Sequence, residues 1–379
     1  MKKIAVLTSF LPLAALAQIL VSANDNKEVL LNGVHVVLAN APPDTATIID
    51  FSSSPPKFLA ELNVPASWSG PPQSVAITPD GALALVTNST KMSPADATKT
   101  VADRILTVID LQAKPPAFLA TLQTGLAPNG VSINAAGTLA LVANRAESSV
   151  SVFTIHGKTV TPAGRIDLAD TNCGPSMAAF TPDGKTALVT CTNTHRLAVL
   201  SVNGTDVRDT KHDISAGLRP VGIEITPEGE YAIVGNIGNG PTGGVDTLSV
   251  VELKGNAPRV VNSVAVGVAP EGIALSPKGD YLAVNLMNGS ILPTASPYYR
   301  DFGILKVLRR QGADLTPVTE VHIGHWCQGV AWSRDQQMVI VGCMTEKRLY
   351  VFHFDGTHLT PQAPILVNGG PAGMGTTPR

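Results

Sequence analysis

The stretch from Pro71 to Asn88 reads PPQSVAITPDGALALVTN: prolines, a short apolar run, a Pro-Asp-Gly turn and a second apolar run. The same pattern returns as APNGVSINAAGTLALVAN (127–144), GPSMAAFTPDGKTALVTC (174–191), RPVGIEITPEGEYAIVGN (219–236), APEGIALSPKGDYLAVN (269–285) and WCQGVAWSRDQQMVIVGC (326–343). From Pro72 to Pro371, the entering positions follow one another at intervals of 44 to 57 residues. Repetition at this period predicts one body built from similar units, although a chain of 379 residues could hold two domains.

Each copy contains four candidate strands. In the first copy, residues 74–78 and 83–87 flank the turn at Pro79-Asp80-Gly81, residues 104–111 form a third β-rich run, and a fourth leads to the next copy. Four short antiparallel strands per repeat are typical of the blade of a β-propeller. The sequence therefore predicts an all-β fold.

A seventh copy is divided between the two ends of the chain. Residues 371–376 match a first strand, residues 34–40 (VHVVLAN) match a second strand, and residues 47–51 match a third. We therefore expect the C-terminal strand to complete a blade that the N-terminal strands begin. This pairing would close a seven-bladed ring and leave no sheet edge along the seam.

Two of the strand ends carry a family resemblance. ALVTN (84–88) and ALVAN (140–144), each after a turn of the Pro-Asp-Gly type, resemble the YVTN-repeat propellers, a group that is also similar to the lactonase-type propellers. The resemblance covers nearly all of the chain after its first residues and implies architecture more than chemistry. Lactonase-type propellers share a Pro-His step entering one strand and an Asn-Glu after another. The corresponding steps here are Pro128-Asn129, Pro220-Val221 and Asn144-Arg145.

The N-terminus has the pattern of a targeting segment. Lys2 and Lys3 precede the apolar stretch 4–20, and Val21-Ser22-Ala23 fits a cleavage site, with Ala15-Leu16-Ala17 as the alternative. We predict a signal peptide over 1–23 and one propeller domain over 24–379, located in the periplasm or secreted. A retained membrane anchor is the alternative, but the stretch is short for one.

Charge and cysteine content narrow the partners and the compartment. The net charge is −2 and the basic residues are scattered, so we expect neither nucleic acid nor a membrane surface as a partner. We also expect the protein to be a monomer. Export permits disulfides. The turns at 181–184 and 333–336 place Cys173 near Cys191 and Cys327 opposite Cys343, which predicts two disulfides within blades; four free thiols are the alternative.

Three long loops indicate a working face. The loop that enters the first strand of a blade and the loop that joins its second and third strands open on the same side of a propeller. Of the second kind, 89–103, 237–245 and 286–302 are long. Long loops on a rigid scaffold concentrate binding residues, so we predict a binding site there; three neutral insertions are the alternative.

Candidate site residues are polar, charged or aromatic departures from the repeat near this face. The binding candidates are Gln73, Asn129, Arg219, Glu224, Trp326, Gln328, Tyr298 and Arg300. The catalytic candidates are Glu271, His195 and His325 as acid or base, and Arg145, which like Arg219 could hold a carboxylate or an oxyanion.

Glu224 stands where other copies have alanine or serine, so its carboxylate needs a partner or a function. We expect a structural ion pair with Arg219, Arg145 or Arg196. His322 and His325 are three residues apart on a strand and point to opposite faces, which is poor metal geometry. The sequence contains none of the common zinc, calcium, nucleotide or haem motifs, so we expect no metal and no cofactor.

Two functions fit these features. The first is an exported, non-catalytic propeller that binds a small polar ligand or a periplasmic protein at the face with the long loops. The alternative is a lactonase-like hydrolase or isomerase that acts on a small anionic ring at the channel mouth. The residues alone leave open whether the protein is an enzyme.

Overall fold

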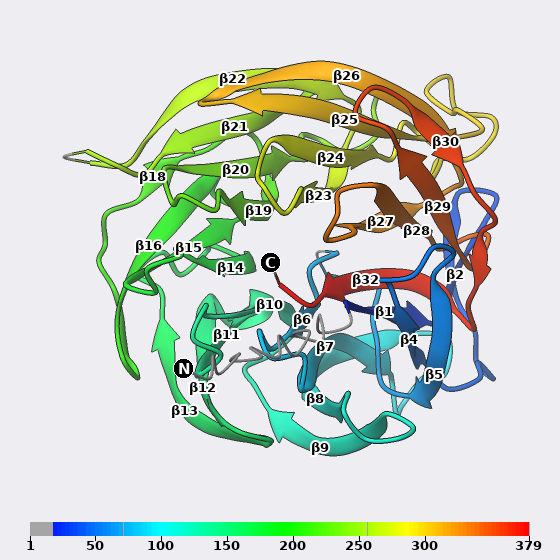
Figure 1. Ribbon diagram of the computed structural model, residues 1–379. Helices are drawn as coiled ribbons and strands as arrows, with labels where there is room; N and C mark the ends of the chain where they lie inside the picture. Colours follow the sequence, from blue (N-terminus) through cyan, green and yellow to red (C-terminus); the bar gives the residue numbers. More distant parts are fainter. Residues whose placement is uncertain (1–17, 71, 256, 379) are drawn as a thin grey trace, which may run out of the picture.

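The chain forms a ring of seven antiparallel sheets, here called blades 1 to 7 (Figure 1). The computed structural model describes residues 18–70, 72–255 and 257–378. Nearly every element within these ranges is a strand; the exception is one 3-10 turn, η1 (Arg145–Glu147). The seven-bladed β-propeller predicted from the repeats is confirmed.

The strands of each blade follow one another outward from the central channel, in chain order. Blade 2 contains β6 (Val75–Ile77), β7 (Leu83–Met92), β8 (Thr100–Asp110) and β9 (Ala117–Gln123). Blade 3 contains β10 (Pro128–Ile133), β11 (Leu139–Asn144), β12 (Ser149–His156) and β13 (Thr159–Asp167). Blade 4 contains β14 (Pro175–Phe180), β15 (Thr186–Cys191), β16 (Arg196–Asn203), β17 (Asp206–Asp209) and the short β18 (Ile214–Ser215). Blade 5 contains β19 (Pro220–Ile225), β20 (Tyr231–Asn236), β21 (Asp246–Glu252) and β22 (Arg259–Gly267). Blade 6 contains β23 (Pro270–Leu275), β24 (Tyr281–Leu286), β25 (Gly303–Gln311) and β26 (Asp314–Ile323). Blade 7 contains β27 (Cys327–Trp332), β28 (Met338–Cys343), β29 (Arg348–Phe354), β30 (Leu359–Pro361) and the short β31 (Ile365–Leu366).

Blade 1 joins the two ends of the chain. Its innermost strand is β32 (Gly370–Thr376), followed by β1 (Ile19–Asp25), β4 (Thr45–Asp50) and β5 (Lys57–Asn63). Met374 lies opposite Ser22 in the ladder between β32 and β1. Figure 1 shows the red C-terminal strand beside the dark blue β1. The predicted closure is confirmed.

The identity of the second strand in blade 1 differs from the prediction. Residues 34–40 do not form it; Val34–Val37 is β3, which pairs with β2 (Glu28–Leu31) in a separate hairpin. The second strand is instead β1. Its Val21 and Ala23 are fully buried in the core that blade 1 shares with blade 2. Asn24 then donates hydrogen bonds to the hydroxyls of Thr45 and Thr47, as Asn144 does to Ser149 and Ser151 in blade 3.

This strand spans the predicted boundary between residues 23 and 24. β1 begins at Ile19, so a cut after Ala23 would remove most of a core strand. Residues 1–17, which hold most of the predicted signal peptide, lie outside the described residues. No helix within the described ranges is long and apolar enough to cross a membrane.

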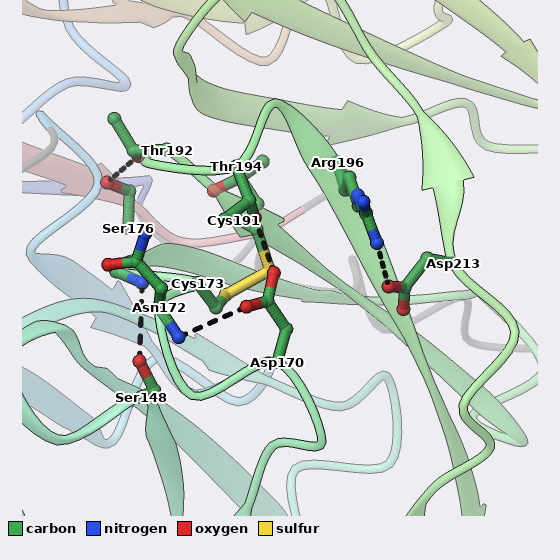
Figure 2. Close-up of a disulfide and its surroundings, with 12 residues drawn as sticks. Ser148, Asp170, Asn172, Cys173, Ser176, Cys191, Thr192, Thr194, Arg196 and Asp213 are labelled. Carbon is green, nitrogen blue, oxygen red and sulfur yellow. Dashed lines mark hydrogen bonds and ion pairs between the residues drawn. A yellow bond between two sulfur atoms is a disulfide. The ribbon is translucent and has the colours of Figure 1, made fainter.

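Both predicted disulfides are present. Cys173–Cys191 joins the entrance of β14 to the end of β15 in blade 4, and Cys327–Cys343 joins β27 to β28 in blade 7. Figure 2 shows the first of them next to Thr194 and Asp170, where the Thr194 hydroxyl donates to the Asp170 carboxylate at 2.6 Å. The two bridges fix the inner strand to the second strand at one end of each blade.

Candidate functional site

Four loop insertions lie on one face of the ring, here called the upper face. They join the second and third strands of blades 1, 2, 5 and 6. The loop predicted over 89–103 largely extends β7 and β8, which leaves 93–99 as a short connection. The insertion of blade 1, residues 26–44, was missed because its hairpin carries the strand-like sequence VHVVLAN.

A buried carboxyl group lies where the inner strand of blade 6 begins on this face. Glu271, the second residue of β23, is 8% exposed. Burial raises the pKa of Glu271 to about 7, while the positive charges of Arg145 and Arg219 act in the opposite direction. Burial lowers the pKa of Arg145, and its neighbour Arg219 adds to that effect while Glu271 opposes it. Blades 3, 5 and 6 thus bring two guanidinium groups and one carboxyl group together.

Backbone geometry positions these side chains. Arg219 has a left-handed backbone (φ +55°) just before β19, an arrangement that costs energy for a residue with a side chain. Its N–H donates to Nδ1 of His195, which is also left-handed (φ +61°), at 3.1 Å. The N–H of Arg145, in η1, donates to the Ala127 carbonyl at 3.0 Å. His195 is therefore placed to position Arg219, while its own ring is exposed.

Gln73 and Glu224 form a layer below this cluster. Gln73, from blade 2, spans the channel to blade 5: its Nε2 donates to the Ile223 carbonyl at 3.0 Å and its Oε1 accepts from the Ile223 N–H at 3.2 Å. Nε2 also lies 3.2 Å from Oε1 of Glu224. Arg196, one expected partner of Glu224, instead pairs with Asp213 at 3.4 Å.

Two other rim amides are engaged within the protein. The Gln328 amide lies between the Ala372 carbonyl (2.9 Å) and Nε1 of Trp326 (3.3 Å), with its nitrogen facing the first and its oxygen the second. Oδ1 of the buried Asn129 accepts from the Ser89 hydroxyl at 2.9 Å. Nδ2 of Asn129 has no hydrogen-bond partner within the described ranges, so this amide keeps a free donor at the rim.

The blade 1 hairpin packs on the blade 6 insertion and on the entrance of blade 7. The His35 ring lies 4.6 Å from the rings of both Trp68 and Trp326, measured between centroids. Gly33, at the tip (φ +75°), packs so closely on the backbone of Leu292 and Pro293 that no side chain fits. Trp326, expected to be a ligand contact, is only 1% exposed because the hairpin and its neighbours bury it.

His325 lies in a different cluster from Glu271. Its Nδ1 is 2.6 Å from Oε1 of Glu346 and its Nε2 is 3.0 Å from Oδ1 of Asp301. Burial lowers the pKa of His325, but hydrogen bonds to the two carboxylates outweigh that effect and raise it. These contacts fasten the blade 6 insertion to blade 7.

The other two candidates in that insertion are exposed, and each also contacts a loop of the protein. The Tyr298 ring packs against Gly243 of the blade 5 insertion. Arg300 donates to the Tyr299 and Pro297 carbonyls of its own loop. The structure thus brings Glu271 close to Arg145 and Arg219, places His195 against the backbone of Arg219, and places His325, Tyr298 and Arg300 elsewhere.

The side chains of the described residues leave a space in the channel below Gln73. A cavity of about 530 Å³ occupies it, and its lining includes Gln73 and Glu224 but not Glu271, Asn129 or Gln328. Among the described residues, no group of three or more His, Cys, Asp or Glu side chains could hold a metal ion. The upper cluster and the cavity are therefore two separate features.

Fold and site define a seven-bladed β-propeller with a charged cluster at its upper mouth. No family model matches the chain, and no curated protein does. Among solved structures, it is similar to a putative 6-phosphogluconolactonase from Bacteroides fragilis (TM-score 0.71, 17% identity, 96% of this chain and 99% of that one). It is also similar to a periplasmic gluconolactonase from Pseudomonas aeruginosa (0.68, 14%, 95% and 99%) and to Kuenenia stuttgartiensis hydrazine synthase (0.63, 16%, 82% and 91%). At these identities the likeness shows the fold alone.

Proposed function

We propose that the protein is a lactonase-like hydrolase that opens a small anionic lactone at the upper mouth. The observation that carries this proposal is Glu271, a buried carboxyl group close enough to Arg145 and Arg219 for their positive charges to act on its pKa. The names of the neighbouring propellers, one a putative 6-phosphogluconolactonase and one a periplasmic gluconolactonase, support it. They favour this alternative over the non-catalytic binding function.

The cluster suits ester hydrolysis. An ionised Glu271 takes a proton from water as the water oxygen attacks the ring carbonyl, and the carbonyl oxygen becomes negative. Arg145 and Arg219 stabilise that charge or hold an anionic substituent of the ring. When the ring C–O bond breaks, the protonated carboxyl returns the proton to the leaving alkoxide. A pKa of about 7 suits both steps, since a group that titrates near the working pH is effective as acid and as base.

We also propose export, with cleavage of the signal peptide after Ala17. This alternative site leaves β1 intact, because the strand begins at Ile19. Two disulfides fit an oxidising compartment, and one propeller of similar fold is named as periplasmic. N-terminal sequencing of protein purified from the periplasm of an expressing bacterium tests this: a start at Gln18 supports it, and a start at Asn24 or an intact Met1 contradicts it.

The test of the activity is hydrolysis of glucono-δ-lactone and of its 6-phosphate by the purified protein. We expect turnover above the spontaneous rate and a loss of at least a hundredfold in kcat/KM for Glu271→Gln. The matched control is Glu230→Gln, which replaces an exposed carboxylate paired with Lys254 on the opposite face. Saturable binding of the lactones without turnover would instead establish the binding function, and neither binding nor turnover would leave a protein partner as the alternative.

A further inference from the structure

The inner strand of a blade is entered through a residue with a left-handed backbone. Within the described ranges this holds for five blades, which are entered at Ala127, Gly174, Arg219, Ala269 and Trp326 with φ between +51° and +56°. In each of these blades the N–H of the entering residue donates a hydrogen bond to a group of the preceding blade. Of the five entering residues, Arg219 is the one that carries a charge, so in blade 5 this shared backbone arrangement holds a guanidinium group.

The backbone of Arg219 is held on both sides. Its N–H donates to Nδ1 of His195 at 3.1 Å, and its carbonyl accepts from the N–H of Ile237, the first residue of the blade 5 insertion, at 3.1 Å. His195 is fixed in turn, because its own N–H donates to the Cys191 carbonyl at 2.9 Å and Cys191 is bonded to Cys173. A disulfide of blade 4 thus anchors the imidazole that holds the entrance of blade 5.

The His195 ring acts here as a hydrogen-bond acceptor. An imidazole whose Nδ1 accepts an N–H carries its ring proton on Nε2. The corresponding acceptors before blades 4, 6 and 7 are the side chains of Ser148, Asp246 and Ser290. What blade 5 requires at residue 195 is therefore an acceptor at the position of Nδ1, and a variant that keeps such an acceptor should keep Arg219 in place.

The two guanidinium groups differ in their relation to Glu271. Arg145 acts more strongly than Arg219 on the pKa of Glu271, and burial lowers the pKa of Arg145 itself. In lactone hydrolysis the attacked carbonyl must lie beside the base, so the negative oxygen would form nearer to Arg145. Arg219 is then left for a second negative charge on the same molecule.

We propose that Arg219 is the specificity-determining residue of the upper cluster and that His195 is its positioning residue. Arg219 binds an anionic substituent, a phosphate or carboxylate group, at the end of the lactone away from the ester bond that breaks. Its guanidinium can offer such a group two parallel N–H donors. The role in catalysis rests on the proposed lactonase function, whereas the binding of the anionic group can be measured without turnover.

Hydrolysis of charged and neutral lactones by Arg219→Gln tests the role of Arg219. The pairs are glucono-δ-lactone 6-phosphate with glucono-δ-lactone, and glucaro-1,4-lactone, which carries a carboxylate, with glucono-1,4-lactone. We expect kcat/KM for at least one charged lactone to fall about tenfold or more, mainly through KM, as for a lost charge-assisted hydrogen bond. The neutral lactones should stay within threefold of the parent.

Two further arginine variants serve as comparisons. Arg145→Gln should lose at least a hundredfold in kcat/KM on charged and neutral lactones alike, as expected for a group that stabilises the developing oxyanion. Arg208→Gln, which removes an exposed charge paired with Asp206, should change neither. Equal losses on charged and neutral lactones in Arg219→Gln would overturn the assignment of specificity to Arg219.

Variants of His195 test its positioning role. His195→Ala removes the acceptor and should lower kcat/KM for the charged lactone about threefold to tenfold, with the neutral lactone unchanged. His195→Asn should restore most of this loss, because its Oδ1 is as many bonds from the backbone as Nδ1 and asparagine readily adopts a left-handed backbone. In Arg219→Gln protein, His195→Ala should cause no further loss. A loss that asparagine does not restore, or one that adds fully to that of Arg219→Gln, would overturn the positioning role.

Calorimetric titration with 6-phosphogluconate, glucarate and gluconate separates this proposal from the lactonase function. The parent protein should bind 6-phosphogluconate or glucarate at least tenfold more tightly than gluconate. Arg219→Gln should abolish that preference, and Glu271→Gln should keep it. This pattern without turnover of any lactone would contradict the lactonase function and support the anion site. No such preference in the parent, or an unchanged preference in Arg219→Gln, would overturn the anion site even if lactones are hydrolysed.

Discussion

Glu271→Gln should stabilise the folded protein, and more so as the pH rises. The pKa of Glu271 rises from 4.5 to about 7 on folding because burial disfavours the charged form. The folded state then holds its proton over a range where the unfolded state has released it, so this group costs stability as the pH rises from 4.5 to 7. A difference of about 2.5 pKa units corresponds to about 3 kcal/mol above pH 7. Below pH 4.5 the cost vanishes, because the group is neutral in both states.

The assay is urea unfolding of the parent and of Glu271→Gln at pH 5 and pH 8. The glutamine cannot ionise, so the stability difference between the two proteins should grow by about 2 kcal/mol in favour of the variant between these pH values. Glu230→Gln, which alters an exposed carboxylate, should show no such growth. The same stability difference at both pH values would refute the assignment of a raised pKa to Glu271.

Truncation after Asn368 removes β32 and should lower the melting temperature by more than 10 °C, because it exposes β1 as a free edge; an unchanged melting curve would argue against the closed ring. Replacing Cys173 and Cys191 by alanine should cost about 3 kcal/mol in chemical denaturation, as expected for a closed loop of 18 residues, and a cost near zero would mean the bridge is not formed. The pKa of His325 is raised, so its contribution to stability is present below pH 6.5 and is lost as the pH rises through the higher folded value. Hydrogen exchange of the blade 6 insertion should therefore quicken with rising pH beyond the intrinsic rate, and Glu346→Gln should flatten that dependence.

The fold was predictable because each repeat independently indicates the same four-stranded blade. Six copies give the blade, the split seventh gives the closure, and the turn positions give both disulfides. The single error in strand identity arose in blade 1, where VHVVLAN imitates a second strand but belongs to a hairpin. The true strand, β1, lies at the end of an apolar stretch that also has the pattern of a signal peptide, so local sequence favoured the wrong interpretation.

The site was predictable only in part. Arg145 and Glu271 stand out as departures from the repeat, and the ring geometry brings them together on one face. The partners of His325 could not be foreseen, because Asp301 comes from a neighbouring blade's insertion. The span of Gln73 across the channel to Ile223 could not be foreseen either, since it depends on the channel width rather than on any motif.

The most direct test of the account is the pH profile of kcat/KM for glucono-δ-lactone hydrolysis. If Glu271 acts as the base between Arg145 and Arg219, kcat/KM should rise with pH and level off with a midpoint near 7, where the carboxyl ionises. Glu271→Gln should retain only a small, flat rate. Hydrolysis no faster than the spontaneous reaction, or the same profile in Glu271→Gln, would contradict the proposed function.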